Sequence, residues 1–410
     1  MTSVDELPLF NAMAAPEWSS DLPGVCAELF HHRETPLLLS LDGSVVVYGN
    51  EDLRRLAADP RIGNLPAPLL ARAFQIGAGG SAFERLVANH VFTMNPPEHG
   101  PLRRLFARQF TARNVGRFAA QASSIVDSVI GEAVAAGESD LVRDLANRVA
   151  VEFWGELIGL TPASRRRLAA MLEEVTSAFF FARTPEQTEA VDRVAGDYLA
   201  LVGDAIRLSL AAGDNELLTA MADEFAAVEL DGRPKDLGQL LGAVLMDGFH
   251  TLAVGIANVA HTLLRDEAAW HRVRADHTLA PAAVHEALRL APPSIFTQRF
   301  ALDDVEHDGV VIPAGTALTM LWFAGNRDPE RFPDPDRLDL DRPRAGATTF
   351  GGGIHLCPGR TIAGLLIEVV VQALTRADVR LTGAAEWVPA SSMRQLTTMP
   401  AVLTGQLEQR

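Results

Sequence analysis

A single cysteine in a glycine-rich stretch is the residue of this chain with the clearest capacity for chemistry. Cys357 lies within Phe350–Arg360, which reads FGGGIHLCPGR. Glycines permit turns and close approaches that a side chain would prevent, so they suit a loop packed against a bulky partner. The loop leads into an apolar run, residues 361–374, which predicts a buried helix. Backbone N–H groups and the positive end of that helix would favour the thiolate, the form that binds metals.

A second candidate is a short polar interruption in a long apolar stretch. Residues 237–264 are apolar on all sides of a helix, which predicts that the helix is buried. Within it, Gly248 and Thr251 lie one turn apart, so the threonine hydroxyl can bond back to a carbonyl and open the helix locally. His250 could pass protons, because an imidazole titrates near neutral pH. Alternatively, His250 only packs or hydrogen-bonds inside the helix bundle, and any protons that a reaction there requires come from water or from Asp247.

Cationic side chains form a third group. His99 and Arg103 lie four residues apart after a Pro-Pro pair, so they share one face of the helix that begins there. Two such cations either stay solvated or bind carboxylates through charge-assisted hydrogen bonds. Glu286 and Arg289, three residues apart on another predicted helix, can form an ion pair.

These motifs, in this order and spacing, resemble those of the cytochrome P450 family over nearly the whole chain. The stretch around Cys357 carries the family's pattern Phe-Gly-x-Gly-x-His-x-Cys-x-Gly. The resemblance implies that Cys357 is the proximal ligand of haem b, iron protoporphyrin IX. It also implies that further residues bind the cofactor: Phe350 and Gly359 in the loop, and His99, Arg103, Arg299 and His355 at the propionates.

The same resemblance implies the fold, which is mainly α-helical with a small β region. It implies a single haem domain over residues 1–410 with no fused reductase domain, and haem between the long helix and the cysteine loop. Residues 112–226 agree with this, because they have helical periodicity almost throughout. Two strand-like runs, 36–41 and 44–48, are joined by Asp-Gly, which is a strong hairpin signal. Asn50 is a candidate cap for the helix that follows.

The resemblance further implies a haem-thiolate monooxygenase that inserts one oxygen atom of O2 into an apolar or partly polar organic molecule of bacterial secondary metabolism. Electrons would come from NAD(P)H through a reductase and a separate ferredoxin-type or flavodoxin-type protein. The chain departs from the family in the long helix, where the family pattern is small residue, Gly, any residue, acid, Thr, and Thr or Ser. Gly248 and Thr251 are kept. Asp247, His250 and Leu252 replace the small residue, the acid and the second hydroxyl.

This departure leaves two other functions open. One is an atypical oxidation, either driven by peroxide or coupling two groups oxidatively. The other is a haem-binding sensor or scaffold without turnover. For an oxidation, the candidate catalytic residues are Asp247, Gly248, His250 and Thr251.

Other roles follow from the resemblance alone. Glu286 and Arg289 match a buried ion pair of the family, whose third member would be Arg337, with Arg342 as a rival. Residues 393–399 would form the last turn that lines the pocket. The residues expected to contact substrate are Phe83, Val87, Phe180, Val244, Ile295, Phe296 and Leu396.

Composition indicates the setting of the protein. The net charge of −16 and the pI of about 5.1 argue against non-specific binding to nucleic acid. The two cysteines, Cys26 and Cys357, lie in unlike contexts and form no disulfide framework, which suits a reducing cytoplasm. The first ten residues lack the basic and apolar regions of a signal peptide, and we expect no apolar stretch long enough to span a bilayer. These observations predict a soluble cytoplasmic protein that contacts no membrane.

Overall fold

The structure is a computed structural model that describes residues 2–10, 18–64, 80–175, 178, 183–229, 236–389 and 391–405. The chain divides into two compact units. Unit 1 contains Met1–Leu65, Ala257–Cys357 and Gly383–Met399, and unit 2 contains Pro66–Ile256, Pro358–Thr382 and Pro400–Arg410. Each unit combines segments that are far apart in sequence. A single haem domain over residues 1–410 stays a prediction.

Unit 1 holds most of the β structure. Its strands are β1 (Thr2–Ser3), β2 (Leu37–Leu39), β3 (Val45–Val47), β4 (Ile62–Gly63), β6 (Thr297–Ala301), β7 (Val305–His307), β8 (Val310–Ile312), β9 (Ala317–Met320), β11 (Glu386–Trp387) and β12 (Leu396–Thr398). Its helices are η1 (Val4–Glu6), α1 (Leu22–Phe30), α2 (Asn50–Ala58), α13 (Glu267–Ala275), η7 (His277–Leu279), α14 (Ala280–Leu290), α15 (Trp322–Gly325) and η8 (Gly353–His355).

The main sheet of unit 1 has the strand order β2-β3-β9-β6-β4. β2 and β3 are antiparallel with Leu38 opposite Val46, and Gly43 at their turn has a φ of +79°. Glycine adopts this left-handed conformation without the steric cost of a Cβ, so the predicted hairpin is confirmed. β3 and β9 are parallel, which brings chain segments from the two ends of the sequence together.

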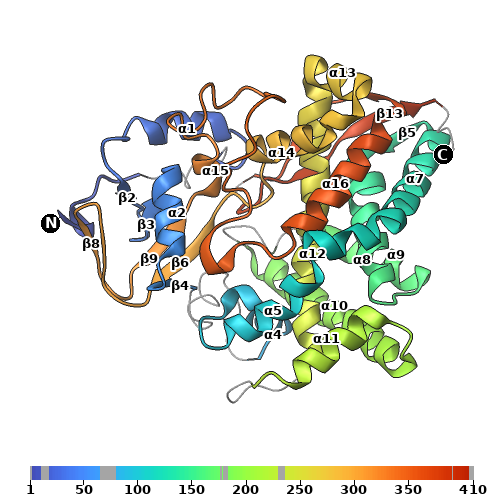
Figure 1. Ribbon diagram of the computed structural model, residues 1–410, viewed down its shortest axis with the longest axis horizontal. Helices are drawn as coiled ribbons and strands as arrows, with labels where there is room; N and C mark the ends of the chain where they lie inside the picture. The colour runs from blue at the N-terminus through green and yellow to red at the C-terminus, as the bar shows by residue number, and fades with distance from the viewer. Residues whose placement is uncertain are drawn as a thin grey trace. The chain divides into compact units, whose positions relative to one another are not determined.

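Helix α2 packs against this sheet (Figure 1). Leu53 and Leu56 are buried in a core with valines of β3 and with Met320 of β9, and each leucine contributes about 2 kcal/mol. The prediction that Asn50 caps α2 is wrong, because Gly49 is the capping residue and Asn50 is already helical. The Asn50 amide instead donates to two distant carbonyls, those of Gly325 and Gly346, at 2.8 and 2.9 Å.

A buried charge network ties α14 to the segment that follows β9. Glu286 and Arg289 pair at 2.7 Å, and Arg289 has no exposed surface. The third member is Arg342, whose Nε donates to Glu286 at 2.9 Å. The prediction of Arg337 is therefore corrected. Its guanidinium is exposed and pairs with Asp339, while only its carbonyl accepts a hydrogen bond from Arg289.

Unit 2 is mainly helical. Its helices are α4 (Ala82–Ala88), η3 (Val91–Thr93), α5 (His99–Gln109), α6 (Ala112–Val115), η4 (Gly116–Phe118), α7 (Ala119–Ala136), the π-helix η5 (Leu141–Asn147), α8 (Arg148–Leu157), α9 (Pro162–Val175), α10 (Pro185–Ala212), α11 (Glu216–Ala226), α16 (Arg360–Leu374) and most of α12 (Leu237–Arg265). Its strands are β5 (Glu138–Asp140), β10 (Asp378–Leu381) and β13 (Pro400–Thr404), in the order β10-β13-β5. Strand β5 interrupts the helical stretch 112–226 that the sequence predicts.

Helix α12 follows the prediction closely, running over Leu237–Arg265 against the expected 237–264. By length and composition alone α12 could cross a membrane, so the expectation that no stretch reaches that length is wrong. However, 78% of its most apolar window is buried inside the protein. Burial in a core explains the apolar composition of α12 without a membrane.

Candidate active site

The loop around Cys357 is held in shape by its own backbone. The N–H of Cys357 donates to the carbonyl of Phe350 at 3.0 Å, and the N–H of Leu356 donates to Gly353 at 3.2 Å. Gly353 has a φ of +62°, and a Cβ built there would lie 1.7 Å from the carbonyl oxygen of Ala57 in α2. Only glycine fits at this position, so the loop can lie directly on the end of α2.

The side chains of this loop are accessible in part. Phe350, His355, Cys357 and Gly359 are all half-buried. The amide nitrogen of Asn64 lies 3.2 Å from Nε2 and 3.3 Å from Nδ1 of the His355 ring. Gly359 is the capping residue of α16, so the loop leads directly into the predicted helix.

The two cysteines differ in what they can do. Neither forms a disulfide. Cys26 is 4% exposed, and burial raises the pKa of its thiol to about 12, which keeps it protonated and inert. Cys357 is the half-buried one, in a loop of backbone donors. Of the two, only Cys357 can meet a large partner.

Arg299 on β6 is a buried cation of unit 1. Its side chain is 8% exposed, and the hydrogen bond that it makes within the described residues goes from Nη1 to the carbonyl of Gln298 at 2.9 Å. No carboxylate of the described residues pairs with it, and burial lowers the pKa of Arg299 to about 10. A buried charge is costly unless it is paired. The carboxylate of a haem propionate would supply the missing partner, so these residues fit the cofactor.

Helix α5 presents the other predicted cations. His99 is its first residue and is 2% exposed, and Arg103 lies four residues later and is half-buried. Arg104 and Arg108 are exposed, and Arg108 pairs with Glu224 of α11 at 3.2 Å. His99 and Arg103 thus share a helix turn as the sequence predicts, and their binding of propionates stays a prediction.

One face of α12 is less buried than the rest of the helix. The partly exposed residues along this part of it are Val244, Asp247, Gly248 and Thr251. Spacings of three, four and seven residues place them on one stripe, which we call the open face of α12. Thr251 donates its hydroxyl to the carbonyl of Asp247, which is the predicted back-bond. His250 lies off this stripe and is 2% exposed.

Two aromatic residues from other segments meet the same turn of α12. Gly248 lies against the indole of Trp154 in α8, where a Cβ would come within 3.3 Å of the ring. His90, just before η3, places Nε2 3.1 Å from Oδ2 of Asp247. Sequence analysis missed His90, because no motif marks it and its partner lies in a distant segment.

The predicted substrate contacts fall in different environments. Phe83 and Val87 are buried on α4, where the guanidinium of Arg183 lies 5.9 Å from the centre of the Phe83 ring. Ile295 and Leu396 are almost wholly buried in unit 1, and Phe296 is half-buried. Residues 393–399 contain strand β12 where a turn was expected. Phe180 lies outside the described residues.

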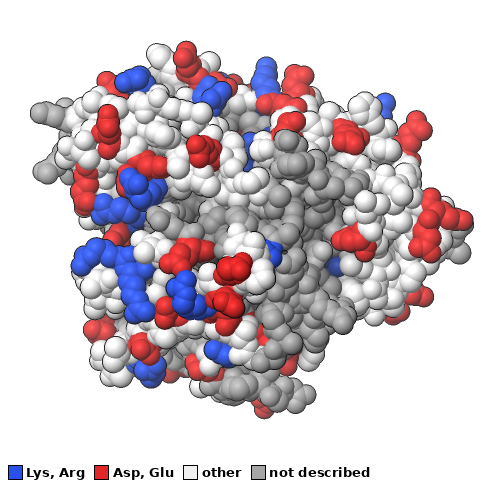
Figure 2. All heavy atoms as spheres, turned by 180° about the vertical axis from the view of Figure 1, so that it is seen from behind, with Lys and Arg blue, Asp and Glu red and all other residues white. Residues whose placement is uncertain are grey.

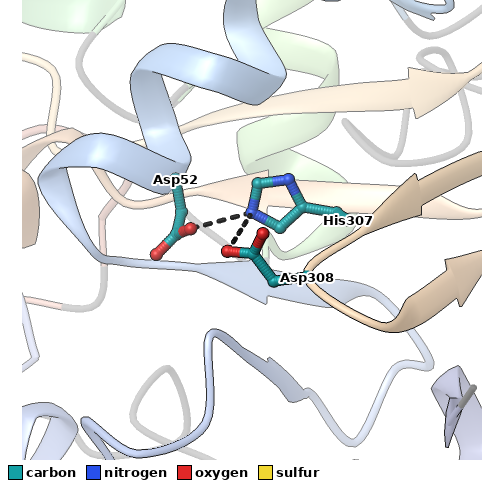
Figure 3. Close-up of side chains that lie close together, drawn as sticks. All are labelled: Asp52, His307 and Asp308. Atoms are coloured by element: carbon teal, nitrogen blue, oxygen red, sulfur yellow. Dashed lines mark hydrogen bonds and ion pairs between the residues drawn. The ribbon is translucent and has the colours of Figure 1, made fainter.

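A second cluster of polar side chains lies in unit 1 (Figure 3). His307 of β7 places Nε2 2.8 Å from Asp52 of α2 and 3.9 Å from Asp308. Both oxygens of Asp308 also accept from Arg55, each at 2.9 Å. The guanidinium already supplies the positive charge that a metal ion would bring. The cluster therefore serves to fasten α2 to the β7–β8 turn.

Comparisons with known proteins show the family and the fold of this chain. The sequence model of the family described as Cytochrome P450 matches residues 234–377. The chain is 32% identical over 370 residues to Cytochrome P450 monooxygenase PikC of Streptomyces venezuelae, covering 87% of this chain and 84% of that protein. It is 30% identical over 289 residues to 6-deoxyerythronolide B hydroxylase of Saccharopolyspora erythraea, covering 70% of each. The crystal structure of CalO2 has the same fold, with a TM-score of 0.84 at 22% identity, covering 97% of this chain and 99% of that chain.

The chain therefore belongs to the cytochrome P450 family. Its fold is the predicted one, mainly helical with small β sheets, and it is a haem-b-dependent monooxygenase. When bound through a thiolate, haem supplies the activation of O2 that amino-acid side chains cannot perform. The predictions of family, fold, enzyme class and cofactor are confirmed.

Proposed function

We propose that this protein oxidises an apolar or partly polar organic molecule in bacterial secondary metabolism, in the cytoplasm. For a hydroxylation the reaction is R–H + O2 + 2 e− + 2 H+ → R–OH + H2O. The observation that supports this proposal most is the likeness, over most of the chain, to PikC and to 6-deoxyerythronolide B hydroxylase, which by its name hydroxylates 6-deoxyerythronolide B. The open face of α12 supports it, because it carries an apolar side chain, Val244, two turns before the hydroxyl of Thr251.

The proposal assigns roles to the residues of the candidate site. Cys357 provides the axial thiolate, and the glycines around it let the cofactor approach the backbone. Arg299 neutralises a propionate, which would relieve the cost of its own burial. His99, Arg103 and His355 bind propionates as well.

Electrons come from a separate ferredoxin-type or flavodoxin-type protein reduced by NAD(P)H. Basic side chains reach the surface in spite of the negative net charge, and they are intermixed with acidic ones on the face shown in Figure 2. Arg104 is exposed, whereas Arg108 is already paired with Glu224. We therefore expect Arg104→Glu to slow reduction at low salt more than Arg108→Glu does. Equal rates at all ionic strengths would refute docking at α5.

Spectroscopy tests the ligand assignment. The reduced carbon-monoxide complex should absorb near the wavelength that gives the family its name, and Cys357→His should abolish that band while retaining haem. Cys26→Ser is the matched control, because Cys26 is buried in unit 1 with a protonated thiol. Survival of the band in Cys357→His would refute the assignment.

Turnover tests the reaction. Candidate substrates are first screened for a shift of the spin-state spectrum, and binders are then incubated with NAD(P)H and redox partners or with peroxide alone. Product that depends on O2 and NAD(P)H supports the monooxygenase. Product from peroxide alone would instead indicate a peroxide-driven oxidation, and the absence of substrate-dependent oxygen consumption would indicate a haem-binding protein without turnover.

A further inference from the structure

We propose that His90 is a positioning residue of the oxygenation reaction. It holds the carboxylate of Asp247 one helical turn before Thr251, and Asp247 thereby supplies the acid that the family carries at position 250. This inference rests on the monooxygenase function proposed above. It gives a role to a histidine that no sequence motif marks.

The contacts of His90 indicate which ring nitrogen carries its proton. Nδ1 accepts a hydrogen bond from the backbone N–H of Phe92 at 3.1 Å, so the proton of the neutral ring lies on Nε2. Nε2 is buried and meets no acceptor of the described residues in ideal hydrogen-bond geometry, while Oδ2 of Asp247 lies 3.1 Å away. A buried N–H requires a partner, and a small rotation of the carboxylate provides one. The imidazole also lies against the ring of Phe92, with the ring centres 3.9 Å apart and the planes tilted by 44°.

Asp247 lies where an acid can serve Thr251. Both residues belong to the open face of α12, and the Asp247 side chain is 43% exposed. Within the described part of the chain, Oδ1 of Asp247 accepts no hydrogen bond, so it can meet water. Because the Thr251 hydroxyl donates its proton to the Asp247 carbonyl, its lone pairs can accept from water. His250 is 2% exposed and lies off this face, which favours the carboxyl over the imidazole.

The carboxyl of Asp247 can then carry protons to the reaction. A proton from bulk water binds Oδ1 and leaves from the same oxygen through water ordered by the Thr251 hydroxyl. The carboxylate is regenerated each time, and two such protons leave with the second oxygen atom as water. His90 keeps its Nε2 proton throughout and acts only by holding Oδ2.

Two substitutions of His90 separate positioning from local folding. His90→Asn keeps an oxygen that can cap η3 through the Phe92 N–H, but it is too short to reach Asp247. His90→Gln places an amide N–H close to where Nε2 lies. We expect Asp247→Asn to slow product formation about 10²-fold and His90→Asn about tenfold, with substrate binding unchanged. His90→Gln should recover most of the loss seen in His90→Asn.

A measurement independent of turnover tests the geometry. Nitrogen-15 NMR of histidine-labelled protein in the diamagnetic reduced carbon-monoxide form should show His90 as the tautomer with its proton on Nε2. His90→Asn assigns the signal by its disappearance. Asp247→Asn should move the Nε2 resonance, because it removes the charge beside that nitrogen. A His90 ring with its proton on Nδ1 would overturn the proposal.

Three kinetic outcomes would also overturn it. They are an unchanged rate in Asp247→Asn, an equal loss in both variants of His90, and a loss in His250→Ala without one in Asp247→Asn. If the wild-type protein consumes no oxygen with any substrate, the proposed function fails instead. The NMR test of the His90–Asp247 pair still stands in that case.

Discussion

Within the described residues, each unit has a histidine in contact with an aspartate, and the surroundings of the two differ. In unit 1, His307 contacts Asp52 at 2.8 Å, and the adjacent Asp308 is bound by Arg55 through both oxygens. In unit 2, His90 contacts Asp247 at 3.1 Å. There, one carboxylate oxygen accepts no hydrogen bond from the described residues, and a threonine with a back-bonded hydroxyl follows one turn later.

The difference shows why pairing alone does not identify a functional acid. At Asp308 the charges are matched inside the cluster, so nothing is left to act on another molecule. At Asp247 the pair fixes the carboxylate and leaves an oxygen that solvent can reach. We call a network closed when its charged groups are paired within the protein, and we call His90–Asp247 the open pair. Substitutions in a closed network should lower stability and leave catalysis unchanged. Substitutions at the open pair should slow catalysis and leave stability unchanged. The predictions below test this division, beginning with the largest expected effect.

The most closed network should give the largest loss of stability. Arg342→Ala leaves Glu286, which is 2% exposed, with one guanidinium partner in place of two. Loss of the partner of a buried charge costs about 3–5 kcal/mol when no other partner remains, and we expect the lower end here because Glu286 keeps Arg289. Arg337→Ala is the matched control and should cost less than about 1 kcal/mol, because its pair with Asp339 is exposed. Denaturant unfolding of the holo-protein measures both, and equal costs would contradict the network as described.

Two threonines of α12 test whether a hydroxyl matters for the reaction only near the candidate site. Thr251 and Thr262 make the same back-bond to the carbonyl four residues earlier, but Thr262 lies about three turns further along α12, beyond the residues that define the open face. Thr251→Ala should divert reducing equivalents to peroxide and slow product formation about 10²-fold, since it removes the hydroxyl that orders water. Thr262→Ala should leave product per NAD(P)H unchanged. Similar peroxide release in the two variants would remove Thr251 from the reaction.

The closed histidine pair should respond in the opposite way. Asp52→Asn replaces a charged acceptor of the buried His307 with a neutral one and removes an acid from the first turn of α2. We expect a loss of about 1–3 kcal/mol in the free energy of unfolding. Product per NAD(P)H should stay at the wild-type value. A fall in product per NAD(P)H without a fall in thermal stability would contradict the prediction that the closed pair affects only stability.

Another histidine, His261, pairs with no carboxylate of the described residues, and the effect that it predicts appears only at acidic pH. Burial, helped by Arg265 and Arg394, lowers the pKa of His261 from 6.5 to about 4. The folded state therefore disfavours the protonated ring, so its contribution is full above pH 6.5 and is lost as the pH falls from 6.5 towards 4. The loss should be about 1 kcal/mol per pH unit in this window.

His261→Gln isolates this contribution, because the carboxylates whose pKa values are lowered, such as Glu286, titrate in both proteins. Thermal melting at several pH values should give a shallower decline for the variant. Parallel curves for the two proteins would mean that His261 is not responsible.

Local patterns in the sequence predicted the elements that depend on neighbours along the chain. The period of apolar residues gave the bounds of α12 to within one residue. Asp-Gly between two valine- and leucine-rich runs gave the β2–β3 hairpin. The errors arose where distant segments decide the outcome. Asn50 binds the carbonyls of Gly325 and Gly346 instead of capping α2, and Arg342 takes the place expected for Arg337.

The residues of the candidate site also differ in whether local sequence patterns or contacts with distant segments determine their role. The Cys357 loop and Thr251 were found because their neighbours in sequence form a recognisable spacing. His90 could not be found in this way, since its partner on α12 comes from a distant segment and no spacing rule connects them. The exposed fraction of each residue on α12, which separates Asp247 from His250, also depends on what packs against the helix and not on the helix itself.

The contact between Gly353 and Ala57 has a consequence for engineering. A Cβ at position 353 would fall 1.7 Å from a carbonyl oxygen of α2, and no rotamer change can relieve a clash with backbone. Any mutant library that randomises the cysteine loop should therefore lose nearly all of its folded members at this one codon. Neighbouring Ile354 is 47% exposed and should accept most side chains. A designer who wishes to retune the loop should vary position 354 and leave position 353 unchanged.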